Sequence, residues 1–466
     1  MVERARVVPL VLAAGTSSRF GSPKLLARLG DRPVLWHVLA ALDGLGLARP
    51  VVVVGHEAEA IRAAVGAEVA SWVVNPRPED GLSGSLRTGL RAVDAAAESV
   101  LILLGDQPAV RSATIEALLG APIGPATVAV VPSYDRGGGA NPVLLRREGF
   151  RLVGEATGDR GLGPILDAAT DRVARVPVTG DNPDVDTPAD LAAAAWADRV
   201  RANREQVDRF REVPDGPDFY GPVSTMFVAD PRRTDDPALE ALLGLVRPGE
   251  RWLDIGAGAG RFALPLALAL GPDGLVVAVD PSDSMRAALT AAAAEHGLAS
   301  VRVVAGRWPP EDLAGFETDV AFIAHVGYDV EAIGPFVDAM EAVARRRCVA
   351  LLMERAPASQ AGVFWPVVHG EARVELPALP EFLALLEARG RVPTVRRIDL
   401  PPRTFAGRDQ LVAQVRRQLW VAPGGEKDRL AMAELDRLAV PVGDGLTLRG
   451  AGPLVAGLVD WAPRPD

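Results

Sequence analysis

Two long stretches of this sequence alternate short apolar runs with amphipathic segments, and that alternation restricts the fold more than any other feature. In the first stretch, residues 7–196, runs rich in branched residues predict strands at 7–12, 51–55, 72–75, 100–105 and 127–132. The segments between them predict helices at 33–45, 58–65, 85–97 and 112–119. Continuous apolar strands separated by helices are typical of a mostly parallel sheet that is covered on both faces. The first stretch therefore predicts a doubly wound α/β domain.

A second alternation begins at Arg251 and predicts another sheet of the same kind. Its expected strands lie at 252–255, 276–279, 301–304, 320–324 and 348–353. Its expected helices lie at 262–270, 284–296 and 334–345. This set of elements is complete enough to fold alone. The tail after Arg355 mixes helical patterns at 381–389, 410–419 and 427–438 with proline-rich turns.

The length of 466 residues is too great for one ordinary core. Thr187 and Pro188 begin a helical pattern that continues through a charged run at 199–212, and prolines and glycines end it from Pro214 onward. We therefore predict a first domain over 1–200, a helical linker over 201–216, and a second domain over 217–466 that includes a C-terminal extension.

Composition limits the classes of function. The formal charge of −10 argues against a general binder of nucleic acid or of anionic membranes. Cys348 is the single cysteine, so an intrachain disulfide and a cysteine-based zinc site are excluded. The apolar run near the N-terminus is short for a signal peptide, and no later run reaches the ~18 residues of a membrane span. We expect a cytoplasmic protein.

The first apolar run leads directly into Leu12-Ala-Ala-Gly-Thr-Ser-Ser-Arg19-Phe-Gly-Ser-Pro-Lys24-Leu-Leu26. The glycines allow the backbone to approach an anion, and the small hydroxyls offer donors. Arg19 and Lys24 bring two positive charges to one short turn, which suits a triphosphate. Because ligands of such sheets bind at the carboxyl ends of the strands, this loop predicts a phosphate-binding site.

Carboxylates follow in two further places. Gly105-Asp106-Gln107-Pro108 comes directly after the strand expected at 100–105. A carboxylate at a strand end beside a phosphate loop is suited to hold a magnesium ion that bridges phosphates. Asp184 and Asp186 precede the helix that starts at Thr187. Each of these acids is a candidate metal ligand or, alternatively, a helix cap.

The opening loop, the Gly105–Pro108 turn, Gly158-Asp159-Arg160-Gly161 and Asp186-Thr187-Pro188-Ala189-Asp190 together resemble the MobA-like nucleotidyltransferases over about residues 5–197. Within that superfamily the sequence is most similar to the cytidylyltransferases of the molybdenum cofactor. The resemblance implies an opening loop that binds the nucleotide and its phosphates. It also implies magnesium, which Asp106 and Asp186 would hold. The implied nucleotide-binding residues are Leu12, Ala13, Ala14, Gly15, Ser17, Arg19, Lys24, Asn75, Gly81, Ser83, Ser85, Gly105 and Asp106.

The resemblance further implies transfer of CMP from CTP to the phosphate of a molybdopterin-type acceptor, with Lys24, Arg19 and Asp106 as the catalytic residues. Guanylyl members typically read Leu-Ala-Gly-Gly at the loop, whereas Ala13, Ala14 and Gly15 match the cytidylyl spelling. Asn141 departs from the family, whose members often carry histidine there. Two alternatives stay open: a sugar phosphate or methylerythritol phosphate as the acceptor, and a nucleotide-sensing protein without catalysis.

The strand expected at 252–255 leads into a run of alternating glycines, Gly256-Ala-Gly258-Ala-Gly260. Such glycines let a cofactor approach the turn between a strand and a helix. A glycine triplet by itself fits a nicotinamide site or an S-adenosylmethionine site. Asp254 precedes the glycines, and Asp280 closes the next strand, where an acid can bind both ribose hydroxyls.

These residues resemble the class I S-adenosylmethionine-dependent methyltransferases over about residues 220–355. The resemblance implies that Asp254, Gly256, Gly258 and Gly260 hold the methionine end, that Asp280 binds the ribose, and that Ser282 and Met285 flank the adenine. His325 and Tyr328 follow the fourth strand, where the family places residues that face the substrate, although a lone histidine is often structural. A nicotinamide site and a cofactor-free scaffold are the alternatives, and the methyl acceptor is not readable.

Overall fold

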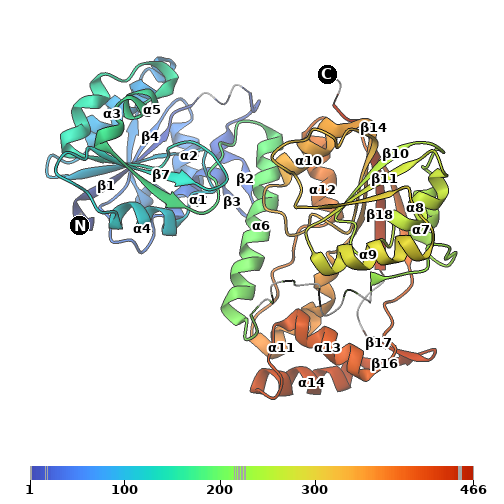
Figure 1. Cartoon of the computed structure of the whole chain (residues 1–466). Helices are drawn as coiled ribbons and strands as arrows, with labels where there is room; N and C mark the ends of the chain where they lie inside the picture. Colours follow the sequence, from blue (N-terminus) through green and yellow to red (C-terminus); the bar gives the residue numbers. More distant parts are fainter. Residues whose placement is uncertain are drawn as a thin grey trace. The chain divides into compact units, whose positions relative to one another are not determined.

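A computed structural model of the chain describes residues 3–15, 17, 19–214, 216, 218, 221, 224, 227–449 and 454–464. Thr16 and Ser18 of the predicted phosphate loop and Asp215 of the predicted linker lie outside these described residues. The chain divides into two compact units, Met1–Ala195 and Trp196–Asp466, which we call unit 1 and unit 2. Helices and strands alternate in both units (Figure 1).

Unit 1 contains a seven-stranded sheet in the order β5-β4-β1-β6-β8-β7-β9. Its strands are β1 (Val7–Ala13), β4 (Val51–Val54), β5 (Ser71–Val74), β6 (Ser99–Leu104), β7 (Ala129–Tyr134), β8 (Val143–Arg146) and β9 (Val173–Val178), and a small hairpin adds β2 (Arg28–Leu29) and β3 (Arg32–Pro33). All neighbouring pairs in the large sheet are parallel except those of β8, which is antiparallel to β6 and β7. The predicted doubly wound, mostly parallel sheet is therefore confirmed.

Two apolar layers cover the sheet of unit 1, one on each face. Its helices are α1 (Val34–Ala40), α2 (Ala58–Val65), α3 (Gly81–Ala92), α4 (Ser112–Gly120) and α5 (Gly163–Ala168), with 3₁₀ helices that include η2 (Lys24–Leu26) and η6 (Gly158–Arg160). All seven residues of β1 are buried, because both faces of this central strand are covered. In register, Leu12 of β1 lies beside Leu104 of β6, so the loops after these two strands leave the sheet side by side.

Two predicted helices of unit 1 have different bounds in the structure. The helix predicted at 33–45 ends at Ala40, and turns follow in which Gly44 and Gly46 have positive φ angles. The helix predicted at 85–97 is α3, which begins four residues earlier at Gly81 and ends at Ala92. A 3₁₀ turn, η4 (Pro78–Asp80), leads straight into α3 and accounts for the earlier start.

Unit 2 contains a second seven-stranded sheet, in the order β12-β11-β10-β13-β14-β18-β15. Its strands are β10 (Arg251–Ile255), β11 (Leu275–Asp280), β12 (Val301–Ala305), β13 (Thr318–Ala324), β14 (Ala344–Met353), β15 (Thr394–Leu400) and β18 (Leu454–Trp461). The first five are mutually parallel, and β18 runs antiparallel to both β14 and β15. This confirms the second predicted α/β sheet.

The prediction for the tail after Arg355 was wrong in one respect. Only helices and turns were predicted there, and the structure also has strands. The tail supplies β15 and β18, which extend the sheet beyond β14, and a separate hairpin of β16 (Ala439–Val442) and β17 (Gly445–Leu448). β15 is mostly exposed and carries two arginines, so its sequence has no apolar run that signals a strand. Its place in the sheet comes from pairing with β18, about sixty residues later in the chain.

The helices of unit 2 fall into two groups. Those that flank the large sheet are α7 (Pro237–Leu243), α8 (Ala263–Leu270), α9 (Asp283–Glu295), α10 (Ile333–Val343) and α12 (Leu379–Ala388). The others, α11 (Trp365–His369), α13 (Arg408–Leu419) and α14 (Glu426–Leu438), share a separate apolar cluster with residues near the β16–β17 hairpin (Figure 1). Val207 of the long helix α6 (Pro188–Phe210) also belongs to that cluster.

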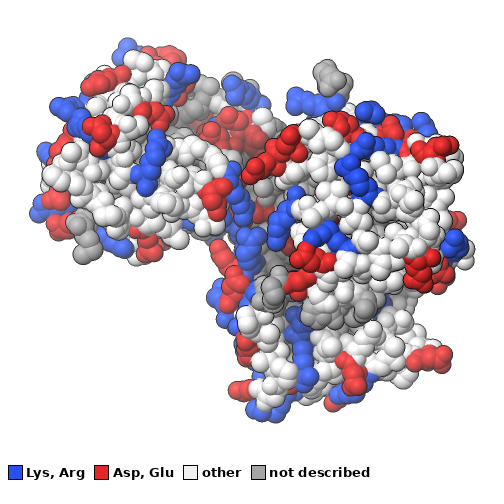
Figure 2. Space-filling view, in the orientation of Figure 1, with Lys and Arg blue, Asp and Glu red and all other residues white. Residues whose placement is uncertain are grey.

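Charged side chains of both signs are interspersed over the face of the molecule that Figure 2 shows. In the described part of the chain, no helix has the length and the apolar character that a membrane span requires.

Candidate functional site

The loop after β1 places Lys24 near the carboxyl ends of the strands. The Lys24 backbone amide donates to the Ser17 hydroxyl oxygen at 3.1 Å, and the amides of Phe20 and Gly21 donate to the Ser17 carbonyl. Ser17 and Gly21 have φ angles of +53° and +77°, which fold the loop back on itself. The side chain of Lys24 is thereby buried although it carries a charge.

Two acids predicted from the sequence meet this lysine. Lys24 Nζ lies 2.5 Å from Asp106 Oδ2 and 2.7 Å from Asp186 Oδ1. Arg19 Nη1 lies 3.5 Å from the other oxygen of Asp186, and the arginine side chain is 78% exposed. The four predicted residues are spread over more than 160 positions of the sequence. They therefore converge, at the carboxyl ends of β1 and β6, from distant segments.

Close backbone packing sets the position of Asp106. The Gly105 amide donates to the Leu12 carbonyl at 2.9 Å. A Cβ atom on Gly105 would lie 3.2 Å from the Ala13 side chain and from Leu12 O, so the small residue allows β6 to end tightly against β1. Ala13 and Ala14 are buried at this point, and Gly15 is exposed.

Electrostatics explain why the Lys24 ammonium tolerates burial. Burial lowers the pKa of Lys24, but the charges and hydrogen bonds of Asp106 and Asp186 outweigh it and raise the pKa above its usual 10.5. The pKa of Asp184 is raised by burial and by the negative charge of Asp106. The centre thus combines one buried cation with three carboxylates, and Arg19 and Asp186 are its more exposed members.

Asp186 is held from the helix that follows it. The backbone amides of Asp186 and Thr187 donate to Asp190 Oδ2 at 3.1 Å and 2.8 Å, and the amide of Asp190 donates to Thr187 Oγ1 at 3.2 Å. This reciprocal capping box starts α6, as the sequence predicted for Thr187 and Pro188. The capping role therefore falls to Thr187 and Asp190, which leaves the Asp186 carboxylate available to Lys24.

The loop after β5 holds the remaining predicted residues of unit 1. Asn75 Nδ2 donates to Ser85 Oγ at 3.1 Å, and the hydroxyl of Ser83 faces the Asp80 carbonyl at 3.5 Å. Asn75, Ser83 and Ser85 are all buried. A Cβ atom on Gly81 would lie 2.4 Å from Asp159 Oδ1, so the start of α3 is pressed against the Gly158–Gly161 turn. The structure gives these residues a shared local framework, and their contact with a nucleotide stays a prediction.

A magnesium ion fits the donor chemistry of unit 1. Asp106 and Asp186 present hard carboxylate oxygens on either side of Lys24 Nζ, so the ammonium would have to move aside for an ion held by both acids. In the described residues no cluster of three or more histidine, cysteine or acidic side chains is arranged to hold a metal. The two carboxylates would therefore need phosphate oxygens of a substrate to complete a magnesium shell, which is the usual way that this ion binds in nucleotide enzymes.

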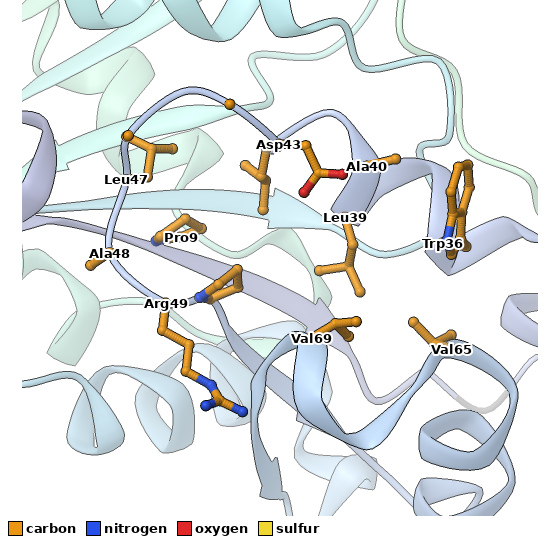
Figure 3. Close-up of a pocket in the computed structure, with 14 residues that line it drawn as sticks. Pro9, Trp36, Leu39, Ala40, Asp43, Leu47, Ala48, Arg49, Val65 and Val69 are labelled. Atoms are coloured by element: carbon orange, nitrogen blue, oxygen red, sulfur yellow. The ribbon is translucent and has the colours of Figure 1, made fainter.

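A pocket of about 260 Å³ in unit 1 lies elsewhere, where β4 begins. Figure 3 shows that Trp36, Leu39 and Val65 line it, with Arg49 at its rim. The guanidinium of Arg49 donates to the carbonyls of Glu68 and Ala70 at 3.0 Å, so it is engaged in holding the local backbone. The pocket contains none of the residues predicted for catalysis.

The glycine turn of unit 2 lies between β10 and α8. Gly256, Gly258 and Gly260 have φ angles of +71°, +55° and +86°, which side chains rarely allow. A Cβ atom on Gly256 would lie 2.5 Å from Val326 Cγ2, and one on Gly260 would lie 2.3 Å from Leu289 Cδ1. Both the conformation and the close packing therefore require glycine, and the turn forms a cradle at the end of β10.

Two acids flank this cradle. Asp280 accepts from the amides of Gly258 at 2.8 Å and Ser282 at 2.9 Å, and the Ser282 hydroxyl caps α9 by accepting from the amide of Met285. Asp254 is buried, and its Oδ2 has no hydrogen-bond partner among the described residues. Burial and the charge of Asp280 raise the pKa of Asp254 to about 8. An unpaired buried carboxylate oxygen beside a glycine cradle fits the ammonium group of a bound amino acid, as S-adenosylmethionine would supply.

Asp218 is a residue of this site that the sequence analysis missed. Its carboxylate accepts from the Ser282 hydroxyl at 2.9 Å and from the Ser284 amide at 3.1 Å. It thus adds an acid to the end of β11, and its charge contributes to a raised pKa of Asp280, for which burial is the main cause. No sequence signal marks Asp218, because it follows a proline-rich break more than sixty residues before Ser282.

His325 and Tyr328 follow β13, as predicted. His325 has a φ angle of +56°, and its Nδ1 lies 3.4 Å from the Tyr328 hydroxyl, which accepts from the Met353 amide at 2.7 Å. Burial lowers the pKa of His325 to about 4, so the ring is neutral at physiological pH. His325 precedes Val326, whose side chain packs against the glycine cradle, since a Cβ atom on Gly256 would lie 2.5 Å from Val326 Cγ2.

Two family models match parts of this chain: a MobA-like NTP transferase domain over residues 9–173 and a methyltransferase domain over residues 253–346. Among curated proteins, the bifunctional protein GlmU of Burkholderia multivorans is 40% identical over 114 residues, which are 24% of this chain and 25% of that protein. The chain spans about a quarter of the length of the curated relatives it matches.

Two solved structures illustrate the neighbours of the two parts. Rv0371c of Mycobacterium tuberculosis, in a complex with manganese, is 31% identical, and the match covers 39% of this chain and 93% of that chain with a TM-score of 0.34. The YcgJ protein of Bacillus subtilis is 18% identical, and the match covers 49% of this chain and 99% of that chain with a TM-score of 0.35.

Proposed function

Because this chain joins a MobA-like NTP transferase domain to a methyltransferase domain, we propose that it is a bifunctional enzyme, with a cytidylyltransferase for the molybdenum cofactor in unit 1 and an S-adenosylmethionine-dependent methyltransferase in unit 2. The observation that carries the first activity is the ion cluster of Lys24 with Asp106 and Asp186 at the carboxyl ends of the strands.

The proposed reaction of unit 1 is nucleotidyl transfer. A phosphate oxygen of the acceptor forms a bond to the α-phosphorus of CTP, the bond from that phosphorus to the bridging oxygen breaks, and pyrophosphate leaves with the electron pair. Lys24 and Arg19 would bind the triphosphate and offset its negative charge, which is the main contribution a protein makes to such transfer. Magnesium held by Asp106 and Asp186 would supply further charge neutralisation when bound.

A second acceptor class deserves a test because of Asn141. This residue stands where relatives often carry histidine, and its carbonyl oxygen accepts from the Tyr134 hydroxyl at 2.9 Å. A site changed at this position is compatible with a sugar phosphate or methylerythritol phosphate in place of the pterin. Both candidates retain the nucleotidyl transfer. A nucleotide sensor without catalysis is the alternative of another class, and the buried Lys24 argues against it.

A nucleotide panel tests the proposal for unit 1. The full-length protein is incubated with CTP, GTP, ATP or UTP and magnesium, and thermal stability and pyrophosphate release with each acceptor are measured. We expect CTP to give the largest stabilisation, and pyrophosphate release to require the acceptor. Stabilisation by GTP alone would contradict the cytidylyl assignment. Stabilisation by a nucleotide with no pyrophosphate release from any acceptor would favour the sensor.

For unit 2 the unpaired Asp254 carboxylate and the glycine cradle support S-adenosylmethionine as the cofactor. Asp280 would accept hydrogen bonds from the ribose hydroxyls, and Ser282 and Met285 would lie beside the adenine. Isothermal titration with S-adenosylmethionine, S-adenosylhomocysteine and NAD⁺ distinguishes the alternatives. Tight binding of NAD⁺ without S-adenosylmethionine binding would contradict the proposal.

A further inference from the structure

The side chain of Gln107 lies in a buried chain of hydrogen bonds beside the ion cluster of unit 1. Its Nε2 donates to Asp184 Oδ1 at 2.9 Å, and its Oε1 accepts from Asn182 Nδ2 at 3.1 Å. Gln107 is 5% exposed and Asn182 is 3% exposed. Both ends of the glutamine amide are thus engaged within the protein, although Gln107 belongs to the Gly105–Pro108 turn that resembles the MobA-like nucleotidyltransferases.

This chain joins two segments that carry the acids of the site. Gln107 directly follows Asp106, and its partners lie 75 and 77 positions later, in the segment that ends at Asp186. A backbone hydrogen bond from the Val185 amide to the Asp106 carbonyl, 2.9 Å long, runs parallel to the side-chain contacts. Asp186 is therefore held on one side by Gln107 through Asp184 and on the other side by the Asp190 cap.

Chemistry explains why an amide suits this position. A glutamine can donate to the Asp184 carboxylate and accept from the Asn182 amide at the same time, which a carboxylate or an apolar side chain cannot do. Removing one partner of a buried hydrogen bond leaves the other unsatisfied, which is unfavourable in a site that water does not reach. Loss of the amide would therefore be relieved by movement of the segment that includes Asp184 and Asp186.

We propose that Gln107 is a positioning residue that fixes the separation of the Asp106 and Asp186 carboxylates, and hence the affinity of unit 1 for a divalent cation. The inference rests on the proposed nucleotidyl transfer, because that reaction is what requires the cation. It also assigns Gln107 a role other than recognition of the base, since its buried amide bonds to Asp184 at one end and to Asn182 at the other.

Three variants of the full chain test this role. Gln107→Leu removes both hydrogen bonds. Gln107→Glu places a second carboxylate against Asp184. The double variant Gln107→Glu with Asp184→Asn exchanges the two groups, so that an amide again donates to a carboxylate across the contact that is 2.9 Å long in the wild type. The matched control is Gln206→Leu, which removes another buried glutamine with three partners, Glu371, Ala372 and Val374, in unit 2.

Two readouts separate positioning from a general loss of structure. The first is the dissociation constant of Mn²⁺ with CTP present, measured from the free-ion signal in electron paramagnetic resonance. The second is pyrophosphate release as a function of Mn²⁺ and of CTP. We expect Gln107→Leu and Gln107→Glu to weaken Mn²⁺ binding about 10-fold to 100-fold, the usual effect of losing a group that orients a metal ligand. We expect the KM for CTP to change much less than kcat.

The double variant should recover most of the Mn²⁺ affinity, and Gln206→Leu should leave it unchanged. Unaltered Mn²⁺ affinity in Gln107→Leu overturns the inference. So does a double variant that binds Mn²⁺ no better than Gln107→Glu while it has the thermal stability of the wild type. A wild-type protein that binds Mn²⁺ with CTP but never releases pyrophosphate contradicts the proposed function and leaves the positioning role supported. A wild type that binds no Mn²⁺ contradicts both.

Discussion

Lys24 is unusual because almost all of the basic residues in this chain are arginines. Of the 50 lysines and arginines, only Lys24 and Lys427 are lysines. An ammonium is a compact charge that can approach two carboxylates from between them, whereas a guanidinium is planar and forked. The structure uses the compact charge where two acids converge, at 2.5 Å and 2.7 Å.

Replacement of Lys24 should therefore be costly even when the charge is kept. We expect Lys24→Met to slow pyrophosphate release about 100-fold or more, the effect of losing one preorganised donor at a reacting group. Lys24→Arg should restore only part of the rate, because the fork cannot occupy the same point. Lys427→Met, which removes the other lysine, is the control and should retain the wild-type rate. Full activity in Lys24→Arg would contradict a geometric role.

The raised pKa of Asp254 predicts how the free energy of unfolding depends on pH. Its pKa is about 8 in the folded protein and 3.8 in an ordinary setting. Between these values the folded protein keeps a proton that the unfolded chain releases, so the free energy of unfolding contributed by Asp254 falls as pH rises. Asp254→Asn carries no such proton. Because one pKa unit corresponds to about 1.4 kcal/mol, the variant should gain at least about 1 kcal/mol relative to the wild type between pH 5 and pH 8.5.

Urea unfolding of both proteins at several pH values measures this gain. A difference between variant and wild type that stays constant with pH would show that Asp254 is ionised in the folded state. The same variant should lose S-adenosylmethionine affinity, because an amide, unlike the carboxyl group, cannot release a proton and become the charged partner of the ligand ammonium.

At the scale of elements, the turn between β10 and α8 combines backbone conformation with close packing. Gly260→Ala meets both obstacles, a φ of +86° and a Cβ only 2.3 Å from Leu289 Cδ1. We expect this variant to weaken S-adenosylmethionine binding more than 10-fold in isothermal titration, since displacement of the turn moves the amides that face the ligand. Gly271→Ala, with a φ of +77° and nothing within 4 Å of its Cβ, carries the strain alone. Gly271 ends α8, at the opposite end of the helix from the turn, so equal losses in the two variants would contradict a specific role of the turn.

The elements also show how far the sequence predicts the fold. Most of the parallel strands were predictable, because each is a short apolar run in an alternation with amphipathic helices. β8, β9, β15 and β18 were not predicted. β9 and β15 lie at edges and are partly exposed, so their sequences lack a continuous apolar run. β18 is apolar, but its strand assignment depends on two partners that are distant in sequence.

The same distinction applies to the site. The rule that ligands bind at the carboxyl ends of strands predicted that the loop with Lys24 and the turn with Asp106 would meet, and the family resemblance added Asp186. The structure brings all three together. The contacts of Gln107 with Asn182 and Asp184, and of Asp218 with Ser282, could not be predicted. They join polar side chains from distant segments, and the hydrophobic periodicity of a sequence does not indicate such pairs.

At the scale of the whole molecule, each unit has its own sheet and its own candidate site. We therefore expect the two sites to respond separately to substitution. Asp106→Asn should abolish pyrophosphate release and leave S-adenosylmethionine binding unchanged. Asp280→Asn should do the reverse, because the two acids belong to different sheets. Loss of both activities in either variant, with the fold verified by circular dichroism, would contradict the separation.

One helix complicates any attempt to treat the two units as interchangeable modules. The division between them falls inside α6, after Ala195. The cap that starts α6 holds the amide of Asp186, whereas Trp196, Val200 and Val207 are buried farther along the same helix. A cut at the division would leave the first half with a stub of about two turns, too short to be a stable helix without tertiary packing. Expression of the two units as separate proteins, divided at this point, should therefore destabilise the nucleotidyltransferase part. Two active proteins would be expected only if each of them contained the complete α6.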